Sequence, residues 1–244
     1  MNRVKVGDST DESVAADLRR GSELRFRTLW SDPVYGVSYS DKNEFLNAID
    51  RGNRIQRPLA NDHMPSKAPA VFSAALKLAL RYAETAASAY ATVPGGSLLP
   101  KFIAAFEASG FSFRSSLVWV KQQFVIGRSD YNFAHEVVLY GWIPNGRHYF
   151  TDDRTQSSVF EVDKPHVSAL HPTCKPIALI ARMLENSTRR GELVCDPFLG
   201  SGSTIVAAHQ LGRVGYGCEI DPGYAAVTLE RISMLGLKPE LVRP

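Results

Sequence analysis

A short motif near the N-terminus combines an acid, a proline and an aromatic residue. Asp32 and Pro33 follow an apolar run that ends at Trp30. Tyr35 comes two positions after the proline, with Val34 between them. An acid side chain and a backbone carbonyl can accept hydrogen bonds from an amino group while an aromatic ring stacks on a flat base. Taken alone, this tetrapeptide is equally typical of an ordinary turn, because Asp and Pro favour turns for local reasons.

A second candidate ligand-binding segment is rich in glycine and lies near the C-terminus. Residues 196–204 lie between an expected strand and an expected helix, and Gly200 and Gly202 let the backbone approach a ligand closely. The segment lacks the Lys-Ser/Thr pair of a P-loop and the third glycine of a dinucleotide fingerprint. Taken alone, a tight structural turn explains it equally well.

An acid at the end of the following strand strengthens the ligand-binding interpretation. Glu219 ends the expected strand at residues 215–219, where a carboxylate can accept hydrogen bonds from ribose hydroxyls. The combination indicates a nucleoside-containing cofactor. Because no phosphate-binding lysine follows the glycines, S-adenosylmethionine fits better than a nucleotide. Upstream, residues 171–176 read His-Pro-Thr-Cys-Lys-Pro, which indicates a capped helix start and also a good place to hold a polar ligand.

The elements that must position these residues alternate along the chain. Strands are expected at residues 4–6, 24–30, 90–93, 116–120, 137–139, 193–195 and 215–219. Helices are expected at residues 13–20, 65–89, 99–109, 176–186, 204–211 and 224–235. Polar connectors are expected at residues 36–65 and 151–169. This alternation predicts an α/β fold with a mostly parallel central sheet covered by helices on both faces.

The composition indicates the general class of protein and the partners that its charge allows. The chain has 244 residues, 44% of them hydrophobic, which suits one globular domain with a sizeable core. Its net charge of +3 permits a polyanionic partner without requiring one. The three cysteines form no CxxC pair, so no metal is expected. The odd cysteine count, the absence of a signal-like N-terminus and the lack of a membrane-length apolar run predict a cytoplasmic protein without membrane contact.

These motifs together, in this order, resemble the β-class amino-methyltransferases of DNA. The matching pieces are residues 32–35, 171–176, 198–202 and Glu219. The turn at residues 7–9 resembles a cofactor-side segment of the family, and the similarity extends through residues 119–121 and 127–136 to nearly the whole chain. The resemblance implies a Rossmann-like methyltransferase fold with a circularly permuted motif order, in a single domain spanning residues 1–244.

The resemblance also implies a role for each matching residue. Asp32, Pro33 and Tyr35 are the expected catalytic residues. The expected cofactor-binding residues are Asp8, Ser9, Asp32, His171, Thr173, Lys175, Asp196, Phe198, Gly200, Ser201, Gly202, Thr204 and Glu219.

The implied activity is methyl transfer from S-adenosylmethionine to the exocyclic N6 of adenine in a nucleotide flipped out of double-stranded DNA. Asp rather than Ser in the motif resembles the adenine branch more than the cytosine-N4 branch, which stays the alternative. One departure is Val34, where the family has a second proline. Val34 frees a φ angle that a proline would fix, while the hydrogen-bond acceptors Asp32 and the Pro33 carbonyl are kept. Because a looser turn would lower activity, the other alternative is a catalytically impaired paralogue that binds DNA or cofactor.

A small target-recognition region is expected from about residues 38–64 and 122–164. The expected DNA-binding residues there and nearby are Lys42, Arg51, Arg54, Arg57, Lys121 and Arg128. For any one of them a solvated polar face explains the charge at least as well. We expect a structural hydrogen bond, rather than acid–base chemistry, from the neighbours His135 and Glu136. A recognition region of this size suggests a homodimer on DNA.

Overall fold

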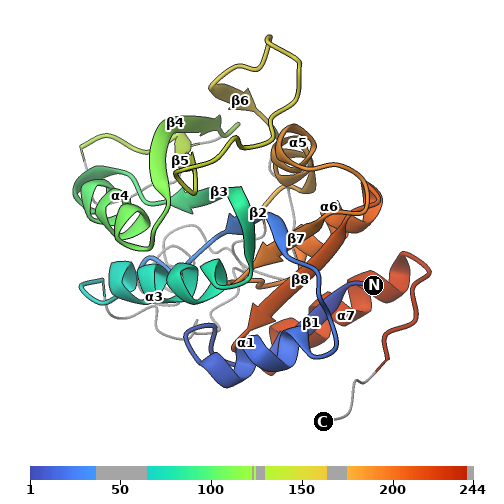
Figure 1. The fold of residues 1–244 in the computed structure, drawn as a ribbon. Helices are drawn as coiled ribbons and strands as arrows, with labels where there is room; N and C mark the ends of the chain where they lie inside the picture. The colour runs from blue at the N-terminus through green and yellow to red at the C-terminus, as the bar shows by residue number, and fades with distance from the viewer. Residues whose placement is uncertain (37–64, 123, 125–129, 164–174, 241–244) are drawn as a thin grey trace, which may run out of the picture.

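A twisted sheet forms the centre of the molecule. The computed structural model describes residues 1–36, 65–122, 124, 130–163 and 175–240. Its strands are β1 (Arg3–Val6), β2 (Phe26–Ser31), β3 (Ala83–Val93), β4 (Ser112–Val120), β5 (His135–Trp142), β6 (Val159–Glu161), β7 (Leu193–Asp196) and β8 (Val214–Glu219). Within these residues the order across the sheet is β1-β8-β7-β2-β3-β5-β4-β6, which Figure 1 shows running from lower right to top. Neighbouring strands are parallel except where β5 pairs antiparallel with β3 and β4.

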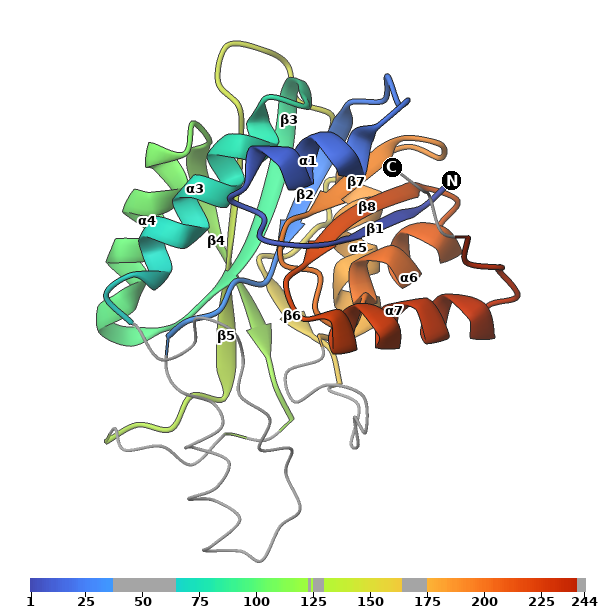
Figure 2. The same ribbon diagram turned by 90° about the horizontal axis from the view of Figure 1, so that it is seen from below.

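Helices cover both faces of this sheet. They are α1 (Glu12–Arg19), α3 (Ala68–Leu80), α4 (Leu99–Ala108), α5 (Ile177–Ser187), α6 (Ser203–Gln210) and α7 (Pro222–Met234), with a 3₁₀ turn, η1, at Gly96–Leu98. Figure 2 shows α1, α3 and α4 on one side and α5, α6 and α7 on the other. Among the described residues, two large apolar clusters result, one around Phe72 and Phe102 and the other around Trp30 and Met183, with a smaller one around Ile205. The expected α/β class is therefore confirmed.

The centre of the sheet is a topological switch point. From β7 the chain passes through α6 to β8, and from β2 it passes through α3 to β3, on the other side of the β7–β2 pair. Because β7 and β2 are parallel neighbours, their carboxyl ends lie together at one edge. Open α/β sheets bind ligands in the crevice at such a point. The fold therefore brings Asp32, after β2, beside the glycine segment that follows β7.

The prediction of a helix over residues 65–89 is wrong in its second half. Helix α3 ends at Leu80, and β3 begins at Ala83 and runs through the alanine-rich stretch. This stretch has small, helix-compatible residues, but β2 and β5 both pair with it, and Ala87 and Ala89 are fully buried. Tertiary pairing in a central strand thus overrides local helix propensity. The expected connector at 151–169 likewise contains the short edge strand β6.

The described residues contain neither a membrane-length apolar helix nor a group of side chains arranged to bind a metal ion. No helix in those ranges is long and apolar enough to cross a membrane. No group of three or more His, Cys, Asp or Glu side chains is arranged there to hold a metal ion.

Candidate functional site

A pocket lies at the carboxyl ends of the central strands. Its wall contains the acidic motif at residues 32–35 and the glycine segment at residues 196–204. Asp8 and Ser9, which follow β1, and Glu219, which ends β8, complete it. Segments that are up to about 210 residues apart in sequence therefore meet in one cavity, because parallel strands end at the same edge.

Asp32 accepts hydrogen bonds from three side chains. The Nζ atom of Lys175 lies 2.7 Å from each carboxylate oxygen of Asp32. The hydroxyl of Thr92, on the adjacent strand β3, donates to Oδ1 at 2.5 Å, and the hydroxyl of Tyr35 lies 3.5 Å from the same atom. The Asp32 carboxylate is thus held in one orientation while it lines the pocket. No pattern in the sequence marks Thr92 as a site residue, because it is one β-branched residue of a strand.

Lys175 also contacts a second carboxylate. Its Nζ atom lies 3.3 Å from Oε2 of Glu136, at the start of β5, and Lys121 Nζ lies 3.1 Å from Oε1 of the same residue. Burial raises the pKa of Glu136, but the ammonium groups of Lys175 and Lys121 outweigh it and lower that pKa to about 2. The structural hydrogen bond expected of Glu136 is present with Lys121, and Glu136 also belongs to an ion-pair chain that reaches Asp32.

Tyr35 borders the pocket from within the core. Its side chain is only 7% exposed, and its ring meets Phe102 edge-on with the centroids 6.0 Å apart. Pro33 and Val34 line the pocket beside it. Stacking of Tyr35 on a base stays a prediction, and the edge-on packing supplies the rigidity that such a platform requires.

Asp196 shapes the glycine segment that follows it. Its carboxylate accepts hydrogen bonds from the backbone N–H of Phe198 at 2.9 Å and from the hydroxyl of Thr204 at 2.5 Å. Complete burial outweighs these bonds and raises the pKa of Asp196 to about 7. Asp196 and Thr204 line the pocket but bond to each other, so both position the loop.

The two glycines of this segment serve different purposes. Gly200 has a φ of +55°, and its N–H donates to Glu219 Oε2 at 2.7 Å. Gly202 has a φ of +81°, and a Cβ there would lie 2.5 Å from the side chain of Thr228 on α7. Gly202 also lies outside the pocket wall. The lack of a side chain at Gly202 thus allows helix α7 to pack closely, and contact of this glycine with a cofactor stays a prediction.

Glu219 holds two backbone groups at the pocket rim. Besides Gly200, the N–H of Asp221 donates to its Oε1 at 2.8 Å. Burial raises the pKa of Glu219, although these backbone bonds act in the opposite direction. Asp8 accepts bonds from the N–H and hydroxyl of Thr10, each at 2.8 Å, which fixes the turn after β1. Ser201 accepts from Arg231 and also lines the pocket.

The charges of the pocket restrict what it can bind. Among its described lining residues five are acids and one, Lys175, is a base. That lysine is paired with Asp32, so the wall offers no unpaired cation for a phosphate. A wall rich in acids, in which the glycine segment lies against Glu219, suits a cationic nucleoside better than a nucleotide.

Several expected residues lie outside the described ranges. They are His171, Thr173, Lys42, Arg51, Arg54, Arg57 and Arg128. Lys121 is described, and its ammonium group faces Glu136 with only 11% of the side chain exposed. A phosphate contact by Lys121 therefore requires that this ion pair open.

The comparisons with known proteins agree with this geometry. Residues 70–230 match the family described as DNA methylase. The type II methyltransferase M2.DpnII of Streptococcus pneumoniae is 30% identical over 146 residues, 52% of this chain and 54% of the relative. M2.LlaDCHI of Lactococcus lactis subsp. cremoris is 28% identical over 145 residues, 53% and 54% of the two chains. The match therefore spans about half the length of these relatives.

Solved structures share the whole fold at low sequence identity. The M1.HpyAVI–SAM complex aligns with a TM-score of 0.68 and 18% identity, covering 95% of this chain and 99% of that one. The cytosine-N4-specific PvuII DNA methyltransferase aligns with a TM-score of 0.67 and 13% identity, covering 98% and 87%. Because the family match covers well over half of the sequence and includes the glycine segment and Glu219, the chain belongs to the DNA methylase family.

Proposed function

We propose that the chain transfers a methyl group from S-adenosylmethionine to the N6 amine of adenine in double-stranded DNA. The observation that carries this proposal is the shared pocket, in which Asp32 and the glycine segment face the same cavity. A methyl donor and an amine must lie in line for direct transfer, and the adjacent ends of β2 and β7 supply the two halves of such a site.

The cofactor half fits S-adenosylmethionine by its charges. Glu219 would accept the ribose hydroxyls, and Asp8, Ser9 and Phe198 line the same cavity. The acid-rich wall favours a cationic sulfonium group over a phosphate. When bound, the cofactor supplies a methyl group activated by the positive sulfur. The M1.HpyAVI complex contains this cofactor in the same fold.

The acidic motif would act on the amine. The Asp32 carboxylate and the carbonyl of Pro33 accept the two amine hydrogens, while Tyr35 stacks on the flipped base. These acceptors would favour a pyramidal nitrogen and stabilise the positive charge that grows on it as the new N–C bond forms and the methyl–sulfur bond breaks, with S-adenosylhomocysteine as the neutral leaving group. The methylated nitrogen would then release one proton to water, which restores the neutral amine. A general base is not needed before the attack, because methylation itself acidifies the nitrogen.

The preference for adenine rests on the identity of the motif. The acid in Asp32-Pro33-Val34-Tyr35 resembles the adenine-N6 branch of the β-class enzymes, whereas Ser is typical of the cytosine-N4 branch. Cytosine-N4 methylation is the second candidate, because the PvuII enzyme, named cytosine-N4-specific, shares this fold. The fold therefore does not distinguish the two bases, and the motif does.

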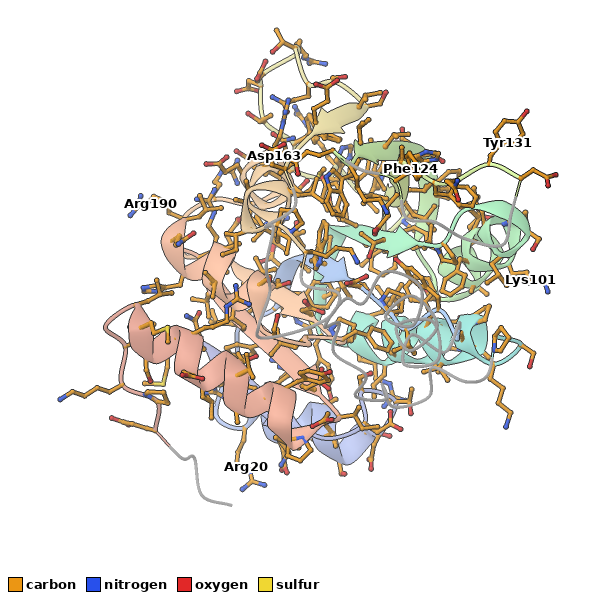
Figure 3. All side chains as sticks on the ribbon, turned by 180° about the vertical axis from the view of Figure 1, so that it is seen from behind. Arg20, Lys101, Phe124, Tyr131, Asp163 and Arg190 are labelled. Carbon is orange, nitrogen blue, oxygen red and sulfur yellow. The ribbon has the colours of Figure 1, made fainter. Side chains whose placement is uncertain are left out.

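DNA would approach the edge at which these strands end. The segment between β4 and β5 leaves the sheet at this edge, since Val120 pairs with His135 and Val93 with Val137. It carries exposed aromatic side chains: Phe124 is 57% exposed and Tyr131 87%, and Figure 3 shows Tyr131 projecting away from the body of the molecule. Exposed aromatic rings suit contact with unstacked bases.

We further propose one domain over residues 1–244, with a homodimer on DNA, in the cytoplasm.

The replacement Asp32→Ala tests the assignment. It removes the charged acceptor, so we expect it to abolish methyl transfer from tritiated cofactor to DNA while cofactor affinity changes by a few-fold at most. DNA without prior adenine methylation serves as substrate, and wild-type protein is the reference. Substantial remaining activity in the Asp32→Ala protein would refute the role of Asp32.

A further inference from the structure

Lys175 lies between two carboxylates that compete for one ammonium group. Its Nζ atom is 2.7 Å from both oxygens of Asp32 and 3.3 Å from Oε2 of Glu136. The lysine side chain is only 8% exposed, so water cannot replace either partner freely. Glu136 is in turn fixed by Lys121, which contacts its other oxygen.

This arrangement conflicts with the chemistry proposed for Asp32. A carboxylate offers about four lone-pair positions. On Asp32 they meet two contacts from Lys175, one from Thr92 and a long one of 3.5 Å from Tyr35. A target amine needs at least one of them in the geometry of attack. The ammonium charge of Lys175 also opposes the positive charge that grows on the amine nitrogen. Efficient methyl transfer therefore requires Lys175 to withdraw from Asp32.

Glu136 has the acceptor that such a withdrawal requires. Its Oε2 atom is buried and receives no hydrogen bond from the residues that the structure describes, although Lys175 Nζ lies 3.3 Å away. Lys121 donates to Oε1 alone and leaves Oε2 directed toward Lys175. A small shift of the Lys175 side chain would thus keep its ammonium group paired with a carboxylate, while Asp32 keeps the hydrogen bond from Thr92 and gains one from the target amine.

We propose that Glu136 is a positioning residue that takes Lys175 from Asp32 when the target amine binds. This inference rests on the proposed function, because the amine is what displaces the lysine. The ammonium groups of Lys175 and Lys121 lower the pKa of Glu136 to about 2, so its carboxylate is charged near neutral pH. The exchange moves one side chain and changes no covalent bond.

The test is the single-turnover rate of methyl transfer at saturating cofactor and DNA. Glu136→Gln removes the competing charge and leaves Lys175 on Asp32. We expect the rate to fall about 10- to 100-fold, as for loss of a charged hydrogen bond, with cofactor affinity changed by about threefold at most. Glu136→Asp keeps the charge and should recover part of the rate. Glu107→Gln, a substitution of the same kind at an exposed position on α4, is the matched control and should leave the rate unchanged.

A double-mutant cycle separates this role from a merely structural one. In a Lys175→Met background no ammonium group remains to be moved, so adding Glu136→Gln should change the rate by about twofold or less. Lys121→Met, which cuts the other ion pair of Glu136, should cost less than Glu136→Gln. The proposal is overturned if the losses from Glu136→Gln and Lys175→Met multiply, or if Lys121→Met and Glu136→Gln slow transfer equally. A wild-type protein with no methyl transfer would instead overturn the proposed function, and this inference with it.

Discussion

Replacing Glu219 tests the cofactor half of the site separately from the chemistry. In the structure its carboxylate accepts the N–H groups of Gly200 and Asp221 at 2.7 and 2.8 Å and lines the pocket. In the proposed complex it also accepts the ribose hydroxyls. Glu219→Ala removes these charged hydrogen bonds, which contribute about 1–3 kcal/mol to binding. The dissociation constant of the cofactor should therefore rise about 5- to 150-fold.

Isothermal titration with S-adenosylhomocysteine, the demethylated product, measures this affinity without turnover. Glu219→Gln is the matched control, because it keeps the shape and one acceptor oxygen and should lose less affinity than Glu219→Ala. Urea unfolding of both variants checks the loop, since Glu219→Ala also leaves two backbone N–H groups without their partner. An unchanged dissociation constant in a folded Glu219→Ala protein would refute the reasoning.

Two further predictions concern the motif and the loop. Val34→Pro should change the methyl-transfer rate by only about threefold or less, because the retained acceptors are Asp32 and the Pro33 carbonyl; a large gain in rate would indicate an impaired enzyme. Burial raises the pKa of Asp196 to about 7 from 3.8, so the folded protein keeps a proton that the unfolded chain releases. The free energy of unfolding should therefore fall, by up to about 4 kcal/mol, as pH rises from about 4 to about 7. Asp196→Asn should remove this fall in urea titrations across that range, and an equally steep pH dependence in the variant would contradict the assignment.

Motif order and periodicity predicted most of the architecture. Strands such as β7 and β8 and helices such as α4 lie within a few residues of their expected positions, because each has a clear apolar pattern ended by glycine or acid. The failure at residues 83–89 has a physical cause. Alanine fits a helix well, and only the pairing of β3 with β2 and β5 decides in favour of a strand.

The candidate site was predictable where its residues follow strands directly. Asp32 and the residues after β7 line one pocket because parallel strands end together. Thr92 and Glu136 were missed as parts of the site, since their contacts depend on which strands become neighbours across the sheet. Lys175 was expected to bind cofactor, and the structure places its ammonium group on Asp32. The glycine pattern likewise could not reveal that Gly202 faces Thr228.

The identity of the methylated nucleoside tests the central claim most directly. DNA without prior methylation is incubated with wild-type protein and S-adenosylmethionine, digested to nucleosides and analysed by mass spectrometry, with Asp32→Ala protein as the negative control. The proposed mechanism predicts N6-methyldeoxyadenosine with wild type and none with the variant. N4-methyldeoxycytidine as the sole product, or no methylated nucleoside from wild type, would contradict it.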